Sequence, residues 1–147
     1  MTRVNLSELL EKGLVEKFQS DKEQIKNEAE IARNDLSSAK KILEVREWTW
    51  AHNAAYNAML QAGRALMFSK GYRSKSQEHH VAVISFVQIV YHTKFPAEIL
   101  QAFDKARRRR NESLYDRAGS ISETQARNLV EKADIFVNKA LEILSLG

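Results

Sequence analysis

The stretch "AAYNAMLQAGRALMFSKGYRSKS", residues 54–76, contains the pattern that decides the fold. It continues an apolar face that recurs every three or four residues, which predicts a helix from about Thr49 to Lys70. The positions on this face are Ala51, Ala55, Ala58, Met59, Ala62 and Leu66. Because most of these side chains are small, a neighbouring helix can approach closely. Gly71 follows as a natural stop, since glycine adopts positive φ at little cost, and residues 72–77 are expected to form a loop.

Helical periodicity also marks the segment before this helix. Residues 5–17 predict a short amphipathic helix, with leucines on one side and Gly13 weakening its end. The capping-box pattern at Ser20–Glu23 opens a second helix, whose apolar positions continue to about Arg46. A tight joint near Glu47 and Trp48 is expected to connect it to the central helix.

The segment after the loop predicts three more helices. Residues 78–92 form the first, with a strand as the alternative because β-branched residues are frequent there. Pro96 suits the first turn of the next helix, which runs directly into four consecutive arginines. The pattern at Ser120–Glu123 caps the last helix, whose apolar period continues to the end of the chain.

The composition supports a single all-α domain. One proline and five glycines in 147 residues leave few breakers, which favours long helices with short connections. We therefore expect an up-and-down bundle of four to five main helices, with a short N-terminal helix in residues 1–19 and the bundle in residues 20–147. The absence of cysteine excludes disulfides, thiolate metal sites and cysteine nucleophiles.

The sequence also indicates where the protein resides. No apolar run approaches the roughly 18 residues that a membrane-spanning helix needs. The N-terminal segment has neither the long apolar core nor the cleavage site of a secretory signal. A cytoplasmic protein is the expectation.

The net charge of +4 is concentrated in one short segment. Residues 105–117 hold six basic and two acidic side chains, so the remaining chain is neutral. The basic side chains are Lys105, Arg107, Arg108, Arg109, Arg110 and Arg117. A local excess of this kind favours phosphates or acidic partners.

The central helix and its exit loop resemble the HEPN superfamily, in particular the small branch known as UPF0332. That branch shows a Tyr-Tyr-Ala-Met segment, an Ala-Arg-Ala-Leu segment, a Lys-Gly pair and a Lys-Ser/Thr-His loop. The matching residues are Tyr56, Ala58, Met59, Arg64, Ala65, Leu66, Lys70, Gly71, Lys75 and Ser76. His80 matches the loop histidine after about two extra residues. The segment "RRRRNESLYD", residues 107–116, and the capped last helix extend the resemblance over about residues 30–145.

The resemblance implies a helical bundle that forms a homodimer. Many HEPN proteins are metal-independent ribonucleases, in which an arginine and a histidine four to six residues later form the site between two copies. Many are toxins paired with a small nucleotidyltransferase. The resemblance therefore implies RNA or a nucleotide, a second copy and a cognate nucleotidyltransferase as partners, and no cofactor.

In this pattern the catalytic residues would be Arg110, Asn111 and Tyr115. Arginine binds phosphate in two places and stays charged, so it suits the charge that develops in RNA cleavage. Tyr115 stands where the family ribonucleases keep histidine. Since tyrosine has a reference pKa of about 10, it is a poor base at neutral pH. Tyrosine can still donate a hydrogen bond or receive a covalent nucleotide.

The predicted nucleic-acid-binding surface adds residues from two other places. Its members are Arg107, Arg109, Arg110, His80 and Lys75. Consecutive helical residues point about 100° apart, so the four arginines cannot all face one ligand. His80 can contribute only if the bundle brings its loop to the basic segment, and a capping or surface role is its alternative. The adjacent pair His79–His80 lacks the spacing of helical metal ligands, so no metal site is expected.

Two main hypotheses for function follow. The first is a HEPN-family RNA- or nucleotide-binding protein, and as a ribonuclease it would be the toxin-like half of a pair with a nucleotidyltransferase. The alternative is a non-catalytic helical module that binds a nucleotide or a protein and has lost the catalytic histidine. A purely structural bundle is the third possibility.

Overall fold

The chain folds as a bundle of helices around one long central helix. The structure, a computed structural model, describes residues 5–75, 77–116 and 118–147. Ser76, which matches the family pattern, and Arg117, of the basic segment, lie outside these residues. The main helices are α2 (Lys22–Glu44), α3 (Trp48–Ser69), α4 (His79–Val90), α5 (Ala97–Asn111) and α6 (Glu123–Ile143). This confirms the predicted all-α bundle, and residues 79–90 form the predicted helix rather than the alternative strand.

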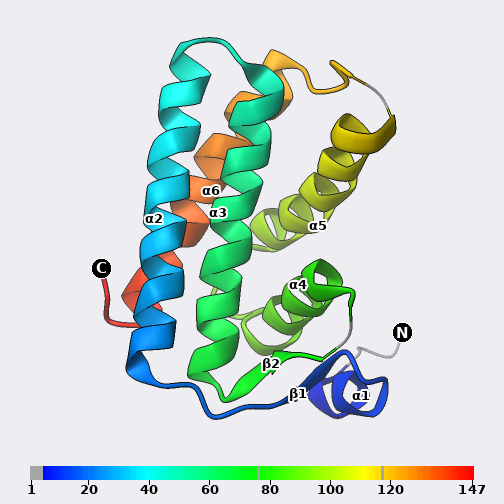
Figure 1. Ribbon diagram of the computed structural model, residues 1–147, viewed down its shortest axis with the longest axis vertical. Helices are drawn as coiled ribbons and strands as arrows, with labels where there is room; N and C mark the ends of the chain where they lie inside the picture. Colours follow the sequence, from blue (N-terminus) through cyan, green and yellow to red (C-terminus); the bar gives the residue numbers. More distant parts are fainter. Residues whose placement is uncertain (1–4, 76, 117) are drawn as a thin grey trace.

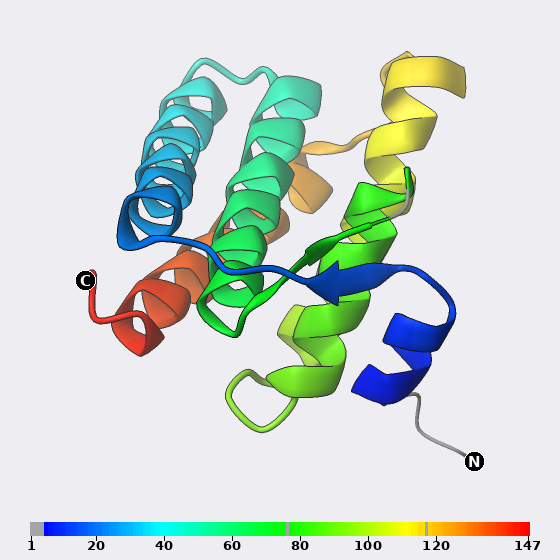
Figure 2. The ribbon, with the colours of Figure 1, turned by 60° about the horizontal axis from the view of Figure 1, so that its bottom comes forward.

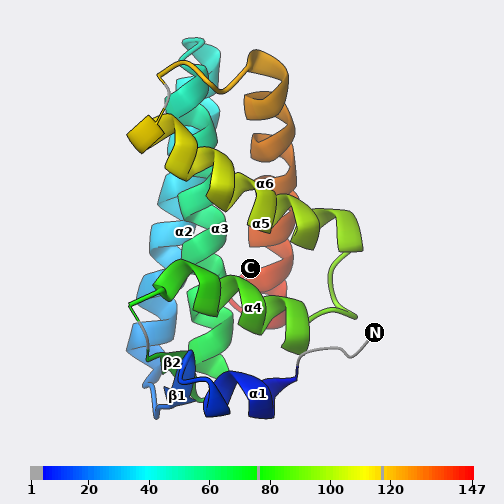
Figure 3. The ribbon, with the colours of Figure 1, turned by 90° about the vertical axis from the view of Figure 1, so that its right-hand side faces the viewer.

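Helix α3 is the element on which the others pack. It runs antiparallel to α2, with α6 behind the pair and with α4 and α5 crossing α3 on the side away from α2 (Figure 1, Figure 3). Its buried residues lie all around the helix and include Ala55, Tyr56, Met59, Ala62 and Leu66. The small side chains of the predicted apolar face therefore lie in the core. Helix α3 ends where expected, since Gly71 follows the C-cap with φ +86°.

The N-terminal segment differs from the prediction. Helix α1 covers only Leu6–Glu11, and residues Val15–Lys17 form strand β1. Strand β1 pairs antiparallel with β2 (Tyr72–Ser74), in the segment that the sequence predicts as a loop (Figure 2). The strands have three residues each, which is too short for an alternating pattern to distinguish them from a helix end or a loop.

The helix starts and the α2–α3 joint follow the sequence with small shifts. Capping boxes open both helices but lie one and two residues later than predicted: Asp21 pairs with Gln24 in α2, and Ser122 pairs with Gln125 in α6. The joint turns at Arg46, which adopts φ +64°. Pro96 is the N-cap of α5 rather than its first helical residue. Helix α5 continues into a π-helical turn, η1 (Glu112–Asp116).

A row of aromatic rings crosses the core from α4 and α5 to α6. Phe95 stacks on Phe136 at 4.6 Å between centroids, and Phe136 meets Phe103 at 5.4 Å. Phe103 in turn contacts Tyr56 of α3 edge-on, at 5.9 Å. This row fixes the ring of Tyr56, whose hydroxyl lies at the candidate site. Within the described ranges, no helix combines the length and apolarity needed to cross a membrane.

Gly63 determines how closely α4 approaches α3. A Cβ atom at this position would lie 2.8 Å from Cγ1 of Val83 and 3.6 Å from Cε2 of Phe103. The first distance is shorter than a van der Waals contact, and the branched Val83 side chain has little freedom to move away. Gly63 therefore permits the close packing of α3 and α4.

The Gly63→Ala variant should lower the free energy of unfolding by about 1–3 kcal/mol through overpacking, even though alanine is the better helix former. The measurement is chemical denaturation. In a Val83→Ala background the same change should be neutral or stabilising, because the clashing methyl group is gone. Additive effects in this double-mutant cycle would contradict the account.

Candidate functional site

A groove of about 310 Å³ lies between the start of α4 and the end of α5. We call it the α4–α5 groove. One wall is the first turn of α4 with the preceding Gln77 and Glu78. The opposite wall holds Arg107, Arg110, Asn111 and Tyr115. His80 lines the groove from α4, so the fold brings together five of the residues predicted for the site.

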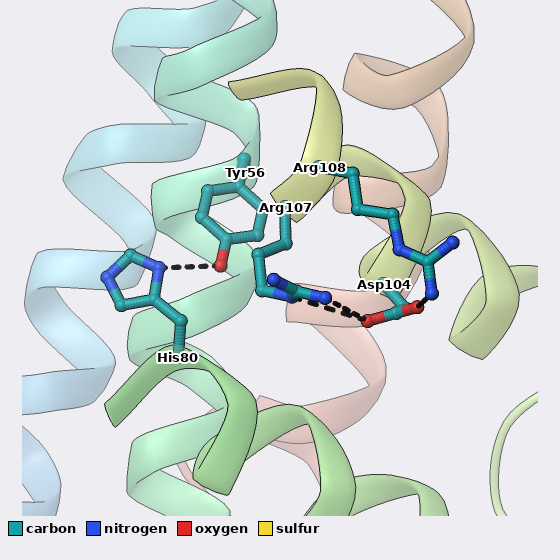
Figure 4. Close-up of polar contacts among 5 residues, drawn as sticks. All are labelled: Tyr56, His80, Asp104, Arg107 and Arg108. Atoms are coloured by element: carbon teal, nitrogen blue, oxygen red, sulfur yellow. Dashed lines mark hydrogen bonds and ion pairs between the residues drawn. The ribbon is translucent and has the colours of Figure 1, made fainter. Parts of the chain in front are cut away.

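His80 is attached to the core through Tyr56. The hydroxyl of Tyr56 lies 2.7 Å from Nδ1 of His80, and the two rings stack at 5.6 Å (Figure 4). Burial raises the pKa of the Tyr56 phenol, and the positive charges of Arg110 and Arg107 only partly oppose this. Tyr56 thus stays protonated at neutral pH. When its hydroxyl donates to Nδ1, the proton of a neutral His80 imidazole is on Nε2; in the other tautomer Nδ1–H donates to the hydroxyl.

The imidazole of His80 is neutral at neutral pH. Burial lowers its pKa, and the positive charges of Arg110 and Arg107 lower it further, with smaller effects from His79 and Arg64. All of these causes act in the same direction. His80 is therefore a neutral hydrogen-bonding group beside two fixed cations.

The arginines differ in how their charges are balanced. Asp104 accepts from both Arg107, at 3.3 Å, and Arg108, at 3.1 Å (Figure 4). Arg107 has a side chain only 22% exposed and lies toward the groove, whereas that of Arg108 is 72% exposed. Arg110 has no carboxylate within ion-pair distance among the described side chains. Its guanidinium lies 6.0 Å from the Tyr56 ring centre and donates to Asn111 Oδ1.

Two residues of the predicted binding surface lie elsewhere. Arg109 contributes to a different depression, which it shares with Lys105 and Lys132 at the α5–α6 interface. Arg109 faces away from Arg107 and Arg110 because consecutive helical residues point about 100° apart.

Lys75 is exposed, and its backbone N–H bonds to the carbonyl of Leu14. The ring of Tyr115 lines the α4–α5 groove and is 75% exposed.

The π-helical turn is held by a buried polar chain from α3. Asn53 Nδ2 donates to Ser113 Oγ at 3.2 Å, and Ser113 donates to the carbonyl of Arg110 at 2.9 Å. Asn53 Oδ1 in turn accepts from His52 Nδ1 at 2.9 Å. The sequence gives one indication of this role, since Asn53 lies three residues before Tyr56 on the same side of the helix. From the sequence, His52 and Asn53 are expected to lie at the surface or between helices. In the structure both side chains are buried.

The groove has the chemistry of an anion site. Two guanidinium groups and the imidazole surround it, and the first turn of α4 presents the positive end of a helix. Helix α4 has no side-chain cap at its start. The Glu78 carboxylate also lines the groove and reduces its positive potential. Among the described residues, no group of three His, Asp or Glu side chains is arranged to hold a metal ion.

The buried His52 should make stability depend on pH. Burial lowers its pKa and Arg109 adds to this, against the hydrogen bond with Asn53. Below the unfolded pKa of about 6.5, the unfolded chain binds a proton that the folded state does not. The free energy of unfolding should therefore fall as the pH decreases from about 7.5 to about 5.5.

A His52→Gln variant should show a shallower fall in chemical denaturation across this pH range. It should not be flat, because the pKa of His80 is lowered in the same direction. Burial raises the pKa of Glu28, which acts with the opposite sign but equally in both proteins. Identical pH dependences would show that His52 titrates normally in the folded state.

Comparisons with known proteins agree with this fold. The crystal structure of TT1696 from Thermus thermophilus is similar with a TM-score of 0.64 and 16% sequence identity, covering 81% of this chain and 97% of that chain. At this identity the likeness shows a shared fold. Comparison with curated proteins gave no match. The model of the HEPN domain matches residues 25–144. Because this match spans most of the chain, the protein belongs to the HEPN family.

Proposed function

We propose that the chain binds RNA or a nucleotide through phosphate groups held in the α4–α5 groove. One observation carries the proposal: Arg107, Arg110 and the neutral His80 converge from two helices on a groove at the start of α4. Arginine forks and helix N-termini are both common phosphate ligands. Membership of the HEPN family supports the same class of ligand.

Arg110 is the principal phosphate-binding residue in this proposal. Arg110 forms no ion pair with a carboxylate among the described side chains, whereas Asp104 bonds to both Arg107 and Arg108. Asn111 orients the Arg110 guanidinium through the hydrogen bond to Oδ1. The exposed Tyr115 hydroxyl is available to donate to the bound strand.

Binding fits the proton positions better than RNA cleavage does. Metal-free cleavage needs a base for the 2′-hydroxyl and an acid for the leaving oxygen. We assign the tautomer in which Tyr56 donates to Nδ1, so that the His80 imidazole offers only an N–H donor at Nε2. Its lowered pKa also makes the imidazolium scarce at neutral pH. We therefore favour the non-catalytic alternative over the ribonuclease.

The family resemblance adds partners to this proposal. A second copy of the chain would place two α4–α5 grooves in one assembly. A small nucleotidyltransferase would be the cognate partner of a toxin-like chain. The second copy and the nucleotidyltransferase are proposed from the family resemblance and not from any contact in the structure.

The Arg110→Ala variant should bind a short fluorescent single-stranded RNA more weakly, and its affinity should depend less on salt. The slope of log affinity against log salt should fall by roughly 0.7 for the lost contact. Fluorescence anisotropy at several salt concentrations provides the measurement. Arg108→Ala is the matched control, because it removes an equal charge that points away from the groove. Equal losses in both variants would mean that the basic segment acts only through its net charge.

Incubation with total RNA in EDTA tests the absence of cleavage. We expect the wild-type protein to leave the RNA intact, because His80 lacks a free basic nitrogen toward the ligand. Cleavage that disappears in both His80→Gln and Arg110→Ala would contradict the binding-only proposal and assign a ribonuclease to this groove. Cleavage that persists equally in both variants would indicate a contaminating nuclease.

A further inference from the structure

A second cavity, of about 720 Å³, adjoins the α4–α5 groove. We call it the side pocket. Gln77, His79 and His80 line both spaces, so the start of α4 is the ridge between them. The volume lies within the range of about 300–1,000 Å³ that is usual for small-molecule sites.

The walls of the side pocket hold two guanidinium groups that lie over aromatic rings. Phe18, which follows β1, lies 5.6 Å from Phe68 of α3 between ring centroids. Arg73 lies over Phe18 at 4.7 Å, and Arg64 over Phe68 at 5.5 Å. Unpaired nucleobases in RNA-binding proteins stack on surfaces of these two kinds.

The two arginines of the side pocket have carboxylate partners, whereas Arg110 in the groove forms no ion pair among the described side chains. Arg73 is paired with Glu16 at 2.8 Å, and Arg64 lies 3.8 Å from Glu28. A second phosphate would therefore gain little from these arginines and would meet their carboxylate partners. An uncharged flat ring suits the side pocket better.

The side pocket also contains an unsatisfied hydrogen-bond acceptor. Gln61 lines it, and Oε1 of Gln61 is buried with no hydrogen-bond partner among the described residues. A buried polar atom without a partner is destabilising. The amide of Asn57, by contrast, is held by Asp35 at 2.5 Å. The Gln61 side chain is only partly buried, and its rotation into the side pocket would let Oε1 accept from an amino group of a ligand.

His80 connects the two spaces through its two ring nitrogens. Nδ1 bonds to Tyr56, and Figure 4 shows Nε2 on the side of the ring away from Arg107. The Nε2–H group is thus directed away from the cations that would hold the phosphate. This places a hydrogen-bond donor at the ridge, where a ribose would join a base to its phosphate.

From these features we infer that the side pocket binds the nucleobase of the nucleotide whose phosphate occupies the α4–α5 groove. Bases with an amino group, namely adenine, cytosine and guanine, are preferred over uracil because they donate that group to Gln61 Oε1. The binding of the phosphate in the α4–α5 groove rests on the proposed function. The binding of the base is inferred from the side pocket alone.

Free nucleosides, which carry no phosphate, test whether the side pocket binds a base. Titration of cytidine and uridine into the full-length protein, followed by NMR of the His80 ring, should show saturable shifts that are larger and tighter for cytidine. Gln61→Met removes the acceptor at similar length and should abolish the difference. Gln101→Met, an exposed glutamine-to-methionine change on α5, is the matched control. No saturable shift with any nucleoside would overturn the inference.

A second comparison uses short single-stranded RNA and an abasic ribose-phosphate strand of equal length. Base stacking of about 1–3 kcal/mol predicts that wild-type protein binds the RNA at least roughly fivefold more tightly. Gln61→Met should reduce only the binding of base-carrying RNA, and Arg110→Ala should weaken both strands. Equal wild-type affinity for both strands would overturn the base pocket alone. Failure of the abasic strand to bind in a salt-dependent way, with nucleosides still bound, would overturn the phosphate groove alone.

Discussion

The hydrogen bond between the Tyr56 hydroxyl and His80 Nδ1 is the contact on which the candidate site depends. Tyr56 belongs to the core, since its ring is fully buried and packs against Phe103. His80 lies at the surface, at the start of α4. Their contact fixes the imidazole against the central helix of the fold. Because Gly63 lets α4 approach α3 so closely, the same packing that fills the core also orients the site.

The electrostatics divide the surface around His80 into two environments. On one side Arg110 forms no ion pair among the described side chains, and the polar chain from Asn53 through Ser113 holds the turn behind it. On the other side the guanidinium groups of Arg64 and Arg73 have carboxylate neighbours. In our proposal a phosphate binds on the first side and an uncharged ring on the second. A single nucleotide contains both groups, which is why one ligand can account for the whole region.

The sequence predicts the fold well because the helices are long and periodic. It fails at strands β1 and β2, which form only through pairing between segments 57 residues apart, such as Glu16 and Arg73. Within the site, the order Arg110, Asn111, Tyr115 is visible in the sequence. The role of Tyr56 is not visible, since the sequence marks it only as a residue that matches the family and does not show that its hydroxyl meets His80. The π-helical turn also has no pattern of its own, and its support from Asn53 depends on how α3 and α5 pack.

The most direct test of the central claim is a map of where RNA touches the protein. Backbone amide chemical shifts, recorded during titration with a short single-stranded RNA, give this map without any substitution. The account predicts that the changes concentrate at Gln77–Val81, the first turn of α4, together with the end of α5. Changes centred instead on residues 125–132 of α6, beside Arg109 and Lys132, would contradict it and place the RNA on the other basic face.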